Sequence, residues 1–523
     1  MRTCTTFLAA AVLISACGGQ APEVDPANQQ FVSVGKSSKT ISTDASTGDE
    51  SFYLAIAKNQ LGQKYFLSAY LTQYFPGAVG YGAARSMGTR VVTFKVQNGK
   101  LIVFDAANGK KDSNKFDPSL IVDAYPIVDG VLTGANAQNY VVFDPSAGMN
   151  QFGALSDAFA QGSQPIKFNI DLSYLQRFRK ITDGVTFEQV FTGYTDAGDP
   201  NSWLGGENNA FRGSGTLGIA LRKYGEGAGF TAAPIYDSPY FFMGDLQLVP
   251  NSGQLTANSI KWNFKKGMKP IKWLISDKVL NAQNDANYKM YDVVGALKAG
   301  IENWNAVFGF KVFEAAVATA NDSYGDDDTN YVIWDEDPSF GAAFANWRNN
   351  PNTGEIRGAS VYMNSLWLID GDAYFNPNHQ TNVRPDGVPQ MLAATEHKPV
   401  PTLTWLGMQE KPLCLMFAPS QRPADDFVAG LVASNPTLSP KQKVEAFLTH
   451  VLLHEIGHTL GLRHNFMGSA LPPSSSVMDY LDNDTSVLVT RPGSYDVDAI
   501  KLLYGMTQSL PPEPFCTDED TYA

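Results

Sequence analysis

The chain has 523 residues, which is long for one hydrophobic core and predicts two domains plus flexible ends. Its content of 44% hydrophobic and 12% aromatic residues allows large cores, which argues against a largely disordered protein. The formal net charge of −13 argues against nucleic acid or anionic lipid headgroups as main partners, because an acidic protein is repelled by both.

The first residues indicate export. Arg2 precedes the apolar run FLAAAVLISA, which is too short to cross a bilayer as a helix. The run ends in LISAC, which resembles the lipobox of bacterial lipoproteins. This resemblance implies a signal peptide at residues 1–16, acylation of Cys17, and attachment through that lipid to a membrane of the bacterial cell envelope, at its periplasmic or surface face. An ordinary signal peptide with an incidental cysteine is the alternative.

A polar segment is followed by a β-rich region. Residues 17–50 are rich in Gln, Ser, Thr, Pro and Asp, so they bury little apolar surface and are expected to be a flexible tether. Residues 51–265 contain short alternating segments between Gly, Asn, Asp and Pro, which predicts a mostly antiparallel β domain. Two of these segments flank Asn98-Gly99, a strong hairpin signal.

The pattern changes in residues 266–510. PIKWLISD predicts a strand, and helical spacing of apolar residues from Val293 to Trp304 predicts a helix. KVFEAA, NYVIWDED, GAAFANW and GASVYMN predict further strands. The fold class is therefore α+β (mixed), with an N-terminal β-rich domain and a second domain in which one helix packs on a mixed sheet. Residues 511–523 are expected to be a tail.

An acidic segment lies between two of the predicted strands. It contains Asp322, Asp326, Asp327 and Asp328, whose carboxylates are suitable ligands for Ca²⁺. A solvated acidic loop is the commoner explanation of such a run. The sequence leaves both readings open.

Four of the six histidines lie in LTHVLLHEIGHTLGLRHNF, in a predicted long helix that begins after Ser439. His450, His454 and His458 are spaced by four residues, so the outer two are about 12 Å apart along the axis. Zinc–nitrogen bonds are only about 2.0–2.1 Å long, so all three cannot bind one ion from an unbroken helix.

The neighbouring residues indicate which histidines bind the metal. Glu455 lies between His454 and His458, where its carboxylate can reach a metal-bound water. Gly461 can adopt a positive φ and end the helix, which lets His464 reach the metal from outside it. Three imidazoles with an open fourth position are typical of a catalytic zinc site. His450 has no adjacent carboxylate, so we expect it to be a packing neighbour that is not needed for zinc binding.

The full spacing H-E-x-x-H-x-x-G-x-x-H resembles that of the metzincin zinc peptidases. SVMDY supplies Met478 for the methionine turn of that family. The resemblance implies one catalytic Zn²⁺ on His454, His458 and His464, a long active-site helix, and hydrolysis of peptides or proteins by a zinc-activated water with Glu455 as general base. The resemblance therefore implies a zinc metalloendopeptidase.

Other positions carry weaker parts of the resemblance. Tyr480 matches the tyrosine that astacins and serralysins use at the metal or oxyanion, with packing under the turn as the alternative. GAAFANW resembles the metzincin edge strand, which implies that residues 342–346 bind an extended peptide as an added strand. Asn465 follows the third ligand and matches none of the best-known groups. The chain is most similar to poorly characterised bacterial secreted or lipoprotein zinc metalloproteases.

Two further features concern regulation and the tail. FMGD at residues 242–245 matches the F-x-G-D latency motif of astacin prosegments, which implies that Asp245 caps the zinc. With only three fixed positions, chance is the alternative. Outside the signal region, Cys414 and Cys516 are the remaining cysteines besides Cys17, and they form a disulfide or stay as two thiols.

Two other functions are compatible with these residues. One is a surface lipoprotein that binds peptides or a partner and has latent or vestigial peptidase activity. Glu455 argues against it, because a protein that only binds gains nothing from a base beside zinc. The other is zinc-dependent hydrolysis of a non-peptide amide.

Overall fold

The computed structural model describes residues 30–39, 41–42, 50–75, 83–108, 120–132, 137–148, 152–155, 157, 164–195, 212–234, 240–338, 341–379, 402–406, 408, 416–419 and 437–521. The signal segment 1–16, Cys17 and Cys414 lie outside these residues, so the lipid anchor and the Cys414–Cys516 disulfide stay predictions. The described part contains many strands and fewer helices, which confirms the predicted mixed fold class. None of its helices has both the length and the apolar character needed to cross a bilayer.

The N-terminal half is built around a nine-stranded sheet. All neighbouring strands are antiparallel, in the order β20-β9-β10-β11-β12-β4-β5-β6-β7. The strands are β4 Lys64–Phe75, β5 Arg85–Gln97, β6 Lys100–Asp105, β7 Ile121–Pro126, β9 Phe152–Leu155, β10 Ile166–Ile181, β11 Gly184–Thr195, β12 Arg212–Lys223 and β20 Thr402–Trp405. The β5–β6 hairpin turns at Asn98 and Gly99, both of positive φ, which confirms the hairpin.

A second, four-stranded sheet corrects the predicted tether. Its order is β2-β1-β3-β8, with β1 Phe31–Gly35, β2 Ile41–Ser42, β3 Phe52–Ala57 and β8 Tyr140–Phe143. Residues 31–35 are therefore a strand and not part of a flexible segment. Phe31, Val32 and Val34 are buried against strands distant in sequence, so this short apolar run gains the burial that its polar surroundings do not offer.

The C-terminal half contains a six-stranded mixed sheet. Its order is β16-β15-β17-β19-β18-β21, and pairing is parallel from β16 to β19 and antiparallel for β18 with both neighbours. The strands are β15 Ile271–Ile275, β16 Phe313–Val317, β17 Asn330–Asp335, β18 Ala342–Asn349, β19 Ile356–Asn364 and β21 Met416–Phe417. A two-stranded ribbon, β13 Gln247–Val249 and β14 Gln254–Thr256, precedes it.

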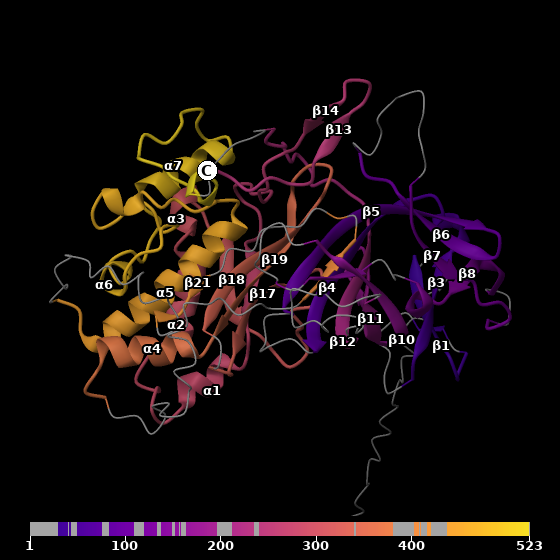
Figure 1. Cartoon of the computed structure of the whole chain (residues 1–523), viewed down its shortest axis with the longest axis horizontal. Coiled ribbons are helices and arrows are strands. Elements are labelled where there is room, and N and C mark those ends of the chain that lie inside the picture. Colours follow the sequence, from indigo (N-terminus) through magenta and orange to yellow (C-terminus); the bar gives the residue numbers. More distant parts are fainter. Residues whose placement is uncertain are drawn as a thin grey trace, which may run out of the picture.

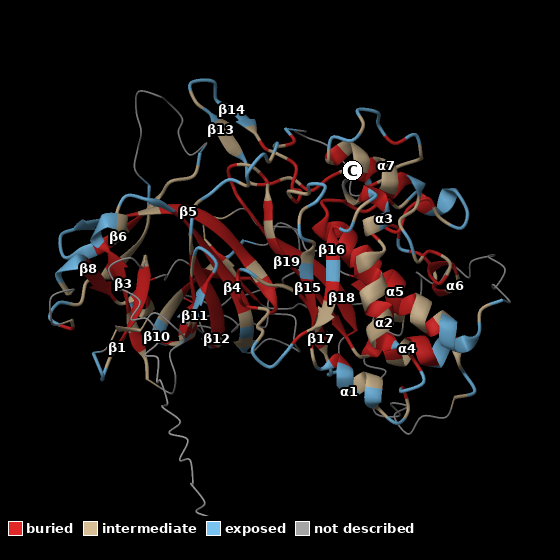
Figure 2. Ribbon diagram, turned by 180° about the vertical axis from the view of Figure 1, so that it is seen from behind, coloured by how far each residue is buried: buried red, intermediate tan, exposed pale blue. Residues whose placement is uncertain are grey.

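Helices cover one face of this mixed sheet, and the nine-stranded sheet lies on its other side (Figure 1). The helices are α1 Val279–Asn284, α2 Val293–Glu302, α3 Asn305–Phe308, α4 Leu366–Phe375, α5 Pro440–Thr459, α6 Asn483–Ser486, α7 Ser494–Leu503 and α8 Asp518–Thr521. Val293, Leu297 and Ile301 of α2 are buried against the sheet and α5, as their spacing predicted. Figure 2 shows that the start of α5 is mostly exposed or intermediate, whereas the rest of α5 and the whole of β18 are buried.

The chain returns to the first sheet from the second half. β20 pairs with β9, and Trp405 packs on Phe152 with ring centroids 6.4 Å apart. Residues 402–405 therefore belong to the nine-stranded sheet, although the sequence placed the whole of 266–510 in the second domain. A pairing between segments this far apart leaves no local pattern in the sequence.

The acidic segment forms part of the contact between the two halves. Asp327 is fully buried and lies 3.0–3.2 Å from arginine nitrogens of Arg222 on β12, Arg348 on β18 and Arg357 on β19. Asp326 pairs with Arg179 on β10. The calcium site that the sequence left open as the less common explanation is not supported, because Asp326 and Asp327 already pair with arginines.

Candidate metal centre

The long helix α5 holds the first two predicted ligands. Ser439 caps it: its hydroxyl accepts a bond from the Gln442 amide, and its own amide donates to the Gln442 side chain. The helix is buried on every side from Phe447 to Thr459. Gly461 then turns the chain with a φ of 105°, which confirms the predicted positive φ at the end of the helix.

The three predicted ligands meet at one point. The ligand atoms of His454, His458 and His464 all lie within 4.8 Å of one another, and each residue is buried. The Nε2 atoms of His454 and His458 are 3.1 Å apart. Two nitrogens that bind the same zinc ion in a tetrahedral site, each at about 2.0–2.1 Å, have a similar separation.

Hydrogen bonds orient two of these imidazoles. Nδ1 of His454 lies 2.8 Å from the Val477 carbonyl, and Nδ1 of His458 lies 2.9 Å from the Leu462 carbonyl. A carbonyl oxygen can only accept, so both Nδ1 atoms carry the proton and both Nε2 lone pairs face the centre of the group.

The imidazoles are held in the neutral form that a metal requires. Burial lowers the pKa of His454 well below its ordinary value. Burial, with His464 nearby, lowers the pKa of His458 to about 3. The pKa of His464 is also lowered by burial. Neutral imidazoles are the ligands that zinc binds.

Glu455 lies beside them without a partner. Its carboxylate is fully buried, and neither oxygen has a hydrogen-bond partner within the described part of the chain. Burial raises its pKa well above 4.5. A buried carboxylate without partners is costly to the fold, and a dication with its water would remove much of that cost. Three converging imidazoles and this carboxylate therefore fit a zinc ion.

The methionine segment lies under the histidines. Met478 is fully buried, and its Sδ packs so closely on Gly457 that a Cβ at that position would collide with it. The Met478 carbonyl accepts a bond from the Asn465 amide at 3.0 Å. Asp496 of α7 fixes the segment from behind, because its carboxylate accepts bonds from the Val477 amide and the Ser476 hydroxyl at 2.7 and 2.6 Å.

Tyr480 and His450 occupy different positions relative to the site. The ring of Tyr480 lies 5.7 Å from the ring of His454 and 4.6 Å from that of His464, and the residue is 43% exposed. It therefore borders the ligand group and is partly exposed to solvent. His450 is buried one turn earlier, outside the group of ligands, and its Nδ1 donates to the Val489 carbonyl at 2.8 Å.

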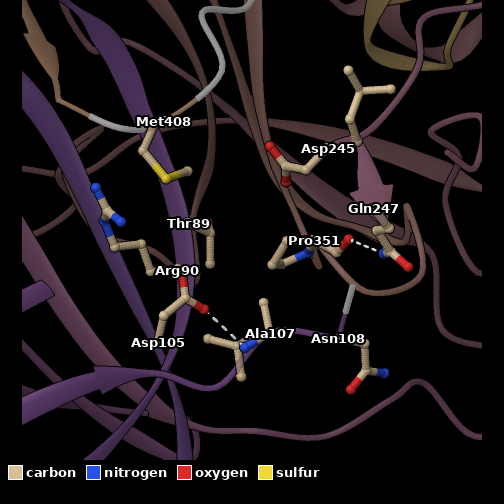
Figure 3. Close-up of a pocket in the computed structure, with 11 residues that line it drawn as sticks. Thr89, Arg90, Asp105, Ala107, Asn108, Asp245, Gln247, Pro351 and Met408 are labelled. Atoms are coloured by element: carbon tan, nitrogen blue, oxygen red, sulfur yellow. Dashed lines mark hydrogen bonds between the residues drawn. The ribbon is translucent and has the colours of Figure 1, made fainter. Parts of the chain in front are cut away.

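The latency switch expected at Asp245 is not supported. Asp245 lines a cavity of about 300 Å³ between the two halves, together with Arg90 and Thr89 of β5 (Figure 3). It is not in the group that could hold the metal. Within FMGD, Phe242 approaches the site instead: its ring lies 5.6 Å from that of His458, and its amide donates to the Gly461 carbonyl.

The predicted peptide-binding edge of β18 is covered. Ala342 and Ala343 pair with β21, and the Asn346 side chain accepts a bond from the Ser86 amide of β5 at 3.1 Å. All eight residues of β18 are buried. The prediction that residues 342–346 bind a peptide as an added strand is therefore wrong, because this edge is already paired and buried.

Sequence reasoning missed the role of the residues after 510. Asp518 has one carboxylate oxygen 3.7 Å from Nδ1 of His464 and the other 2.7 Å from Arg463. The segment expected to be a tail thus reaches the third ligand. The one available signal was Asn465, whose departure from the family pattern marked this loop as different.

Three imidazoles on a buried helix and the turn after it, a neighbouring glutamate and a nearby methionine form a candidate metal site of the metzincin type. Residues 437–513 match the profile of a family described as Met-zincin, which covers α5, the methionine segment and α7. This part of the protein is therefore of the metzincin type. No curated protein and no solved structure gives a significant match.

Proposed function

We propose that the protein is a zinc-dependent endopeptidase in which Glu455 is the general base. The observation that carries this proposal is the buried Glu455 carboxylate, which has no hydrogen-bond partner in the described part of the chain and directly follows His454, one of the three grouped histidines, on α5. A metal site that only stabilises a fold has its fourth position filled by a protein ligand. No fourth His, Cys, Asp or Glu joins the group among the described residues.

The residues have distinct roles in the proposed reaction. Bound zinc supplies Lewis acidity, which makes water a nucleophile near neutral pH. Glu455 accepts a proton from the attacking water on a carboxylate oxygen and later passes it to the leaving amine. Val477 and Leu462 hold the imidazoles of His454 and His458 in one tautomer. Tyr480, which is partly exposed beside the ligands, donates a hydrogen bond from its hydroxyl to the developing oxyanion.

The test separates metal binding from chemistry. The mature protein and its Glu455→Gln variant are incubated with a denatured protein mixture, with and without a zinc chelator, and the cleavage sites are mapped. We expect zinc-dependent internal cleavage by the wild type and at least a 10²-fold loss in the variant, because general-base catalysis contributes about 10²–10⁴-fold. Both proteins should bind zinc.

The matched control is His450→Ala. It removes a buried imidazole one helical turn away that lies outside the ligand group, so zinc content should stay at one ion per chain. Equal cleavage by wild type and Glu455→Gln would end the mechanism. Zinc binding with no cleavage of any protein or peptide would favour a binding lipoprotein or an amidase acting on other amides.

A further inference from the structure

Residues 513–518, here called the clamp segment, lie along the loop that carries the third ligand. The Phe466 amide donates to the Cys516 carbonyl at 2.8 Å. The Asn465 side chain donates to the Pro514 carbonyl at 3.1 Å and accepts from the Cys516 amide at 3.2 Å. Three hydrogen bonds therefore join residues 465–466 to the clamp segment. Asn465, immediately after His464, makes two of them.

The clamp segment is itself anchored in the core. The Phe515 ring packs on Tyr240 with centroids 4.5 Å apart and stacks on Tyr495 of α7 at 5.6 Å. Tyr240 also accepts a bond from the Arg463 amide through its carbonyl, at 3.1 Å. The ligand loop is thus held on both sides of His464. Before it, Arg463 binds Tyr240, which contacts Phe515; after it, residues 465–466 bind the clamp segment itself.

The three ligands differ in how their second nitrogen is held. His454 and His458 donate to backbone carbonyls of the surrounding fold. His464 has no hydrogen-bond partner on either ring nitrogen within the described residues. The acceptor facing its Nδ1 is Asp518, at 3.7 Å, and the same carboxylate binds Arg463 at 2.7 Å. Metal-binding histidines almost always donate the second N–H to a carboxylate or carbonyl.

We propose that Asp518 is the positioning residue for His464 and that the clamp segment completes the metal centre. This inference rests on the proposed zinc site. With Nε2 as the metal ligand, His464 carries its proton on Nδ1, and Asp518 accepts a hydrogen bond from this N–H and fixes the ring plane. Asn465 sets the distance between the ligand loop and the clamp segment. The ligand set is therefore complete only when residues 513–518 are in place.

The affinity for zinc is the first test. The dissociation constant of the full chain is measured by competition with a chromophoric chelator for the wild type, Asp518→Asn, Asn465→Ala and a chain that ends at Leu510. We expect about 10–100-fold weaker binding for each variant, because loss of such an outer partner costs that much in metal affinity. Asp498→Asn is the matched control, since it removes one carboxylate from the exposed side of α7.

A second measurement excludes a general loss of folding. Amide hydrogen exchange of the zinc-free proteins should show faster exchange at residues 463–467 in the chain that ends at Leu510, with unchanged exchange in α5. Unchanged zinc affinity in both Asp518→Asn and the shortened chain would overturn the proposal that the clamp segment completes the metal centre. A wild type that binds zinc but cleaves nothing would overturn the proposed function and leave the clamp result intact, whereas a wild type without zinc would overturn both.

Discussion

At the scale of single residues, two histidines on the same helix have different roles because only one of them faces the other ligands. His450 and His454 lie one turn apart on α5 and both donate Nδ1 to a carbonyl, yet only His454 has its Nε2 near two other imidazoles. Sequence spacing with Glu455 was enough to make that choice. The resemblance had named Tyr480, and the structure adds that its ring lies against two of the ligands, from a segment 16 residues after His464.

Removing the Tyr480 hydroxyl tests whether this ring takes part in chemistry. We expect Tyr480→Phe to lower kcat on the order of 10²-fold, as loss of one oxyanion donor does, while zinc affinity is unchanged because the ring remains. Steady-state kinetics and zinc titration measure the two effects. Tyr374→Phe is the control, since Tyr374 has a similar exposure, 41% against 43%, on α4. An unchanged kcat would assign Tyr480 to packing.

At the scale of elements, features that depend on neighbouring residues could be predicted from the sequence, whereas contacts between distant segments could not. The capping residues of α5, the helical spacing in α2 and Asn98-Gly99 in the hairpin each act within a few residues, so the sequence reveals them. The contacts of β21, β20 and the clamp segment join residues far apart in the chain. No local signal marks such contacts, and for this reason the covered edge of β18 and the role of Asp518 were missed.

The contact between α5 and the methionine segment is a second element-scale test. Gly457→Ala should destabilise the protein by about 1–3 kcal/mol despite the better helix propensity of alanine, because the new Cβ meets the Met478 sulfur and lies 3.0 Å from Trp304. Urea unfolding measures the change. In a Met478→Ala background the same substitution should cost much less. Equal costs in the two backgrounds would contradict the contact.

At the scale of the whole molecule, the two halves share a buried ionic centre at Asp327. Burial alone would raise the pKa of this carboxyl, but Arg357, Arg348 and Arg222 outweigh burial, so the pKa lies below its ordinary value of 3.8. Arg222 comes from the nine-stranded sheet and the other two from the mixed sheet. Arginines of both halves therefore neutralise the buried charge, two from the C-terminal half and one from the N-terminal half.

Asp327→Asn should lower the free energy of unfolding by about 3–5 kcal/mol at pH 7, because it leaves buried arginines unpaired. A lowered pKa stabilises the fold at pH values above the unfolded pKa, and this contribution is lost as the pH falls through the folded pKa. The gap between wild type and variant should thus be constant above about pH 4 and narrow below it.

Urea titrations at pH 7, 5 and 3 measure this gap. Asp328→Asn is the control, because Asp328 contacts Arg179 at the surface and such pairs contribute only about 0–1 kcal/mol. A gap that widens on acidification, or a variant as stable as the wild type at pH 7, would show that the ionic centre does not join the halves.

The strand β20 has a consequence for how the chain folds during synthesis. β9 pairs on one side with β10, but its other edge is completed by Thr402–Trp405, about 250 residues later. Until that segment leaves the ribosome, the nascent N-terminal sheet exposes unpaired backbone groups at β9, where other chains could pair. Late closure of such a long-range contact slows folding. The N-terminal half therefore finishes its fold only after more than half of residues 266–510 have been made.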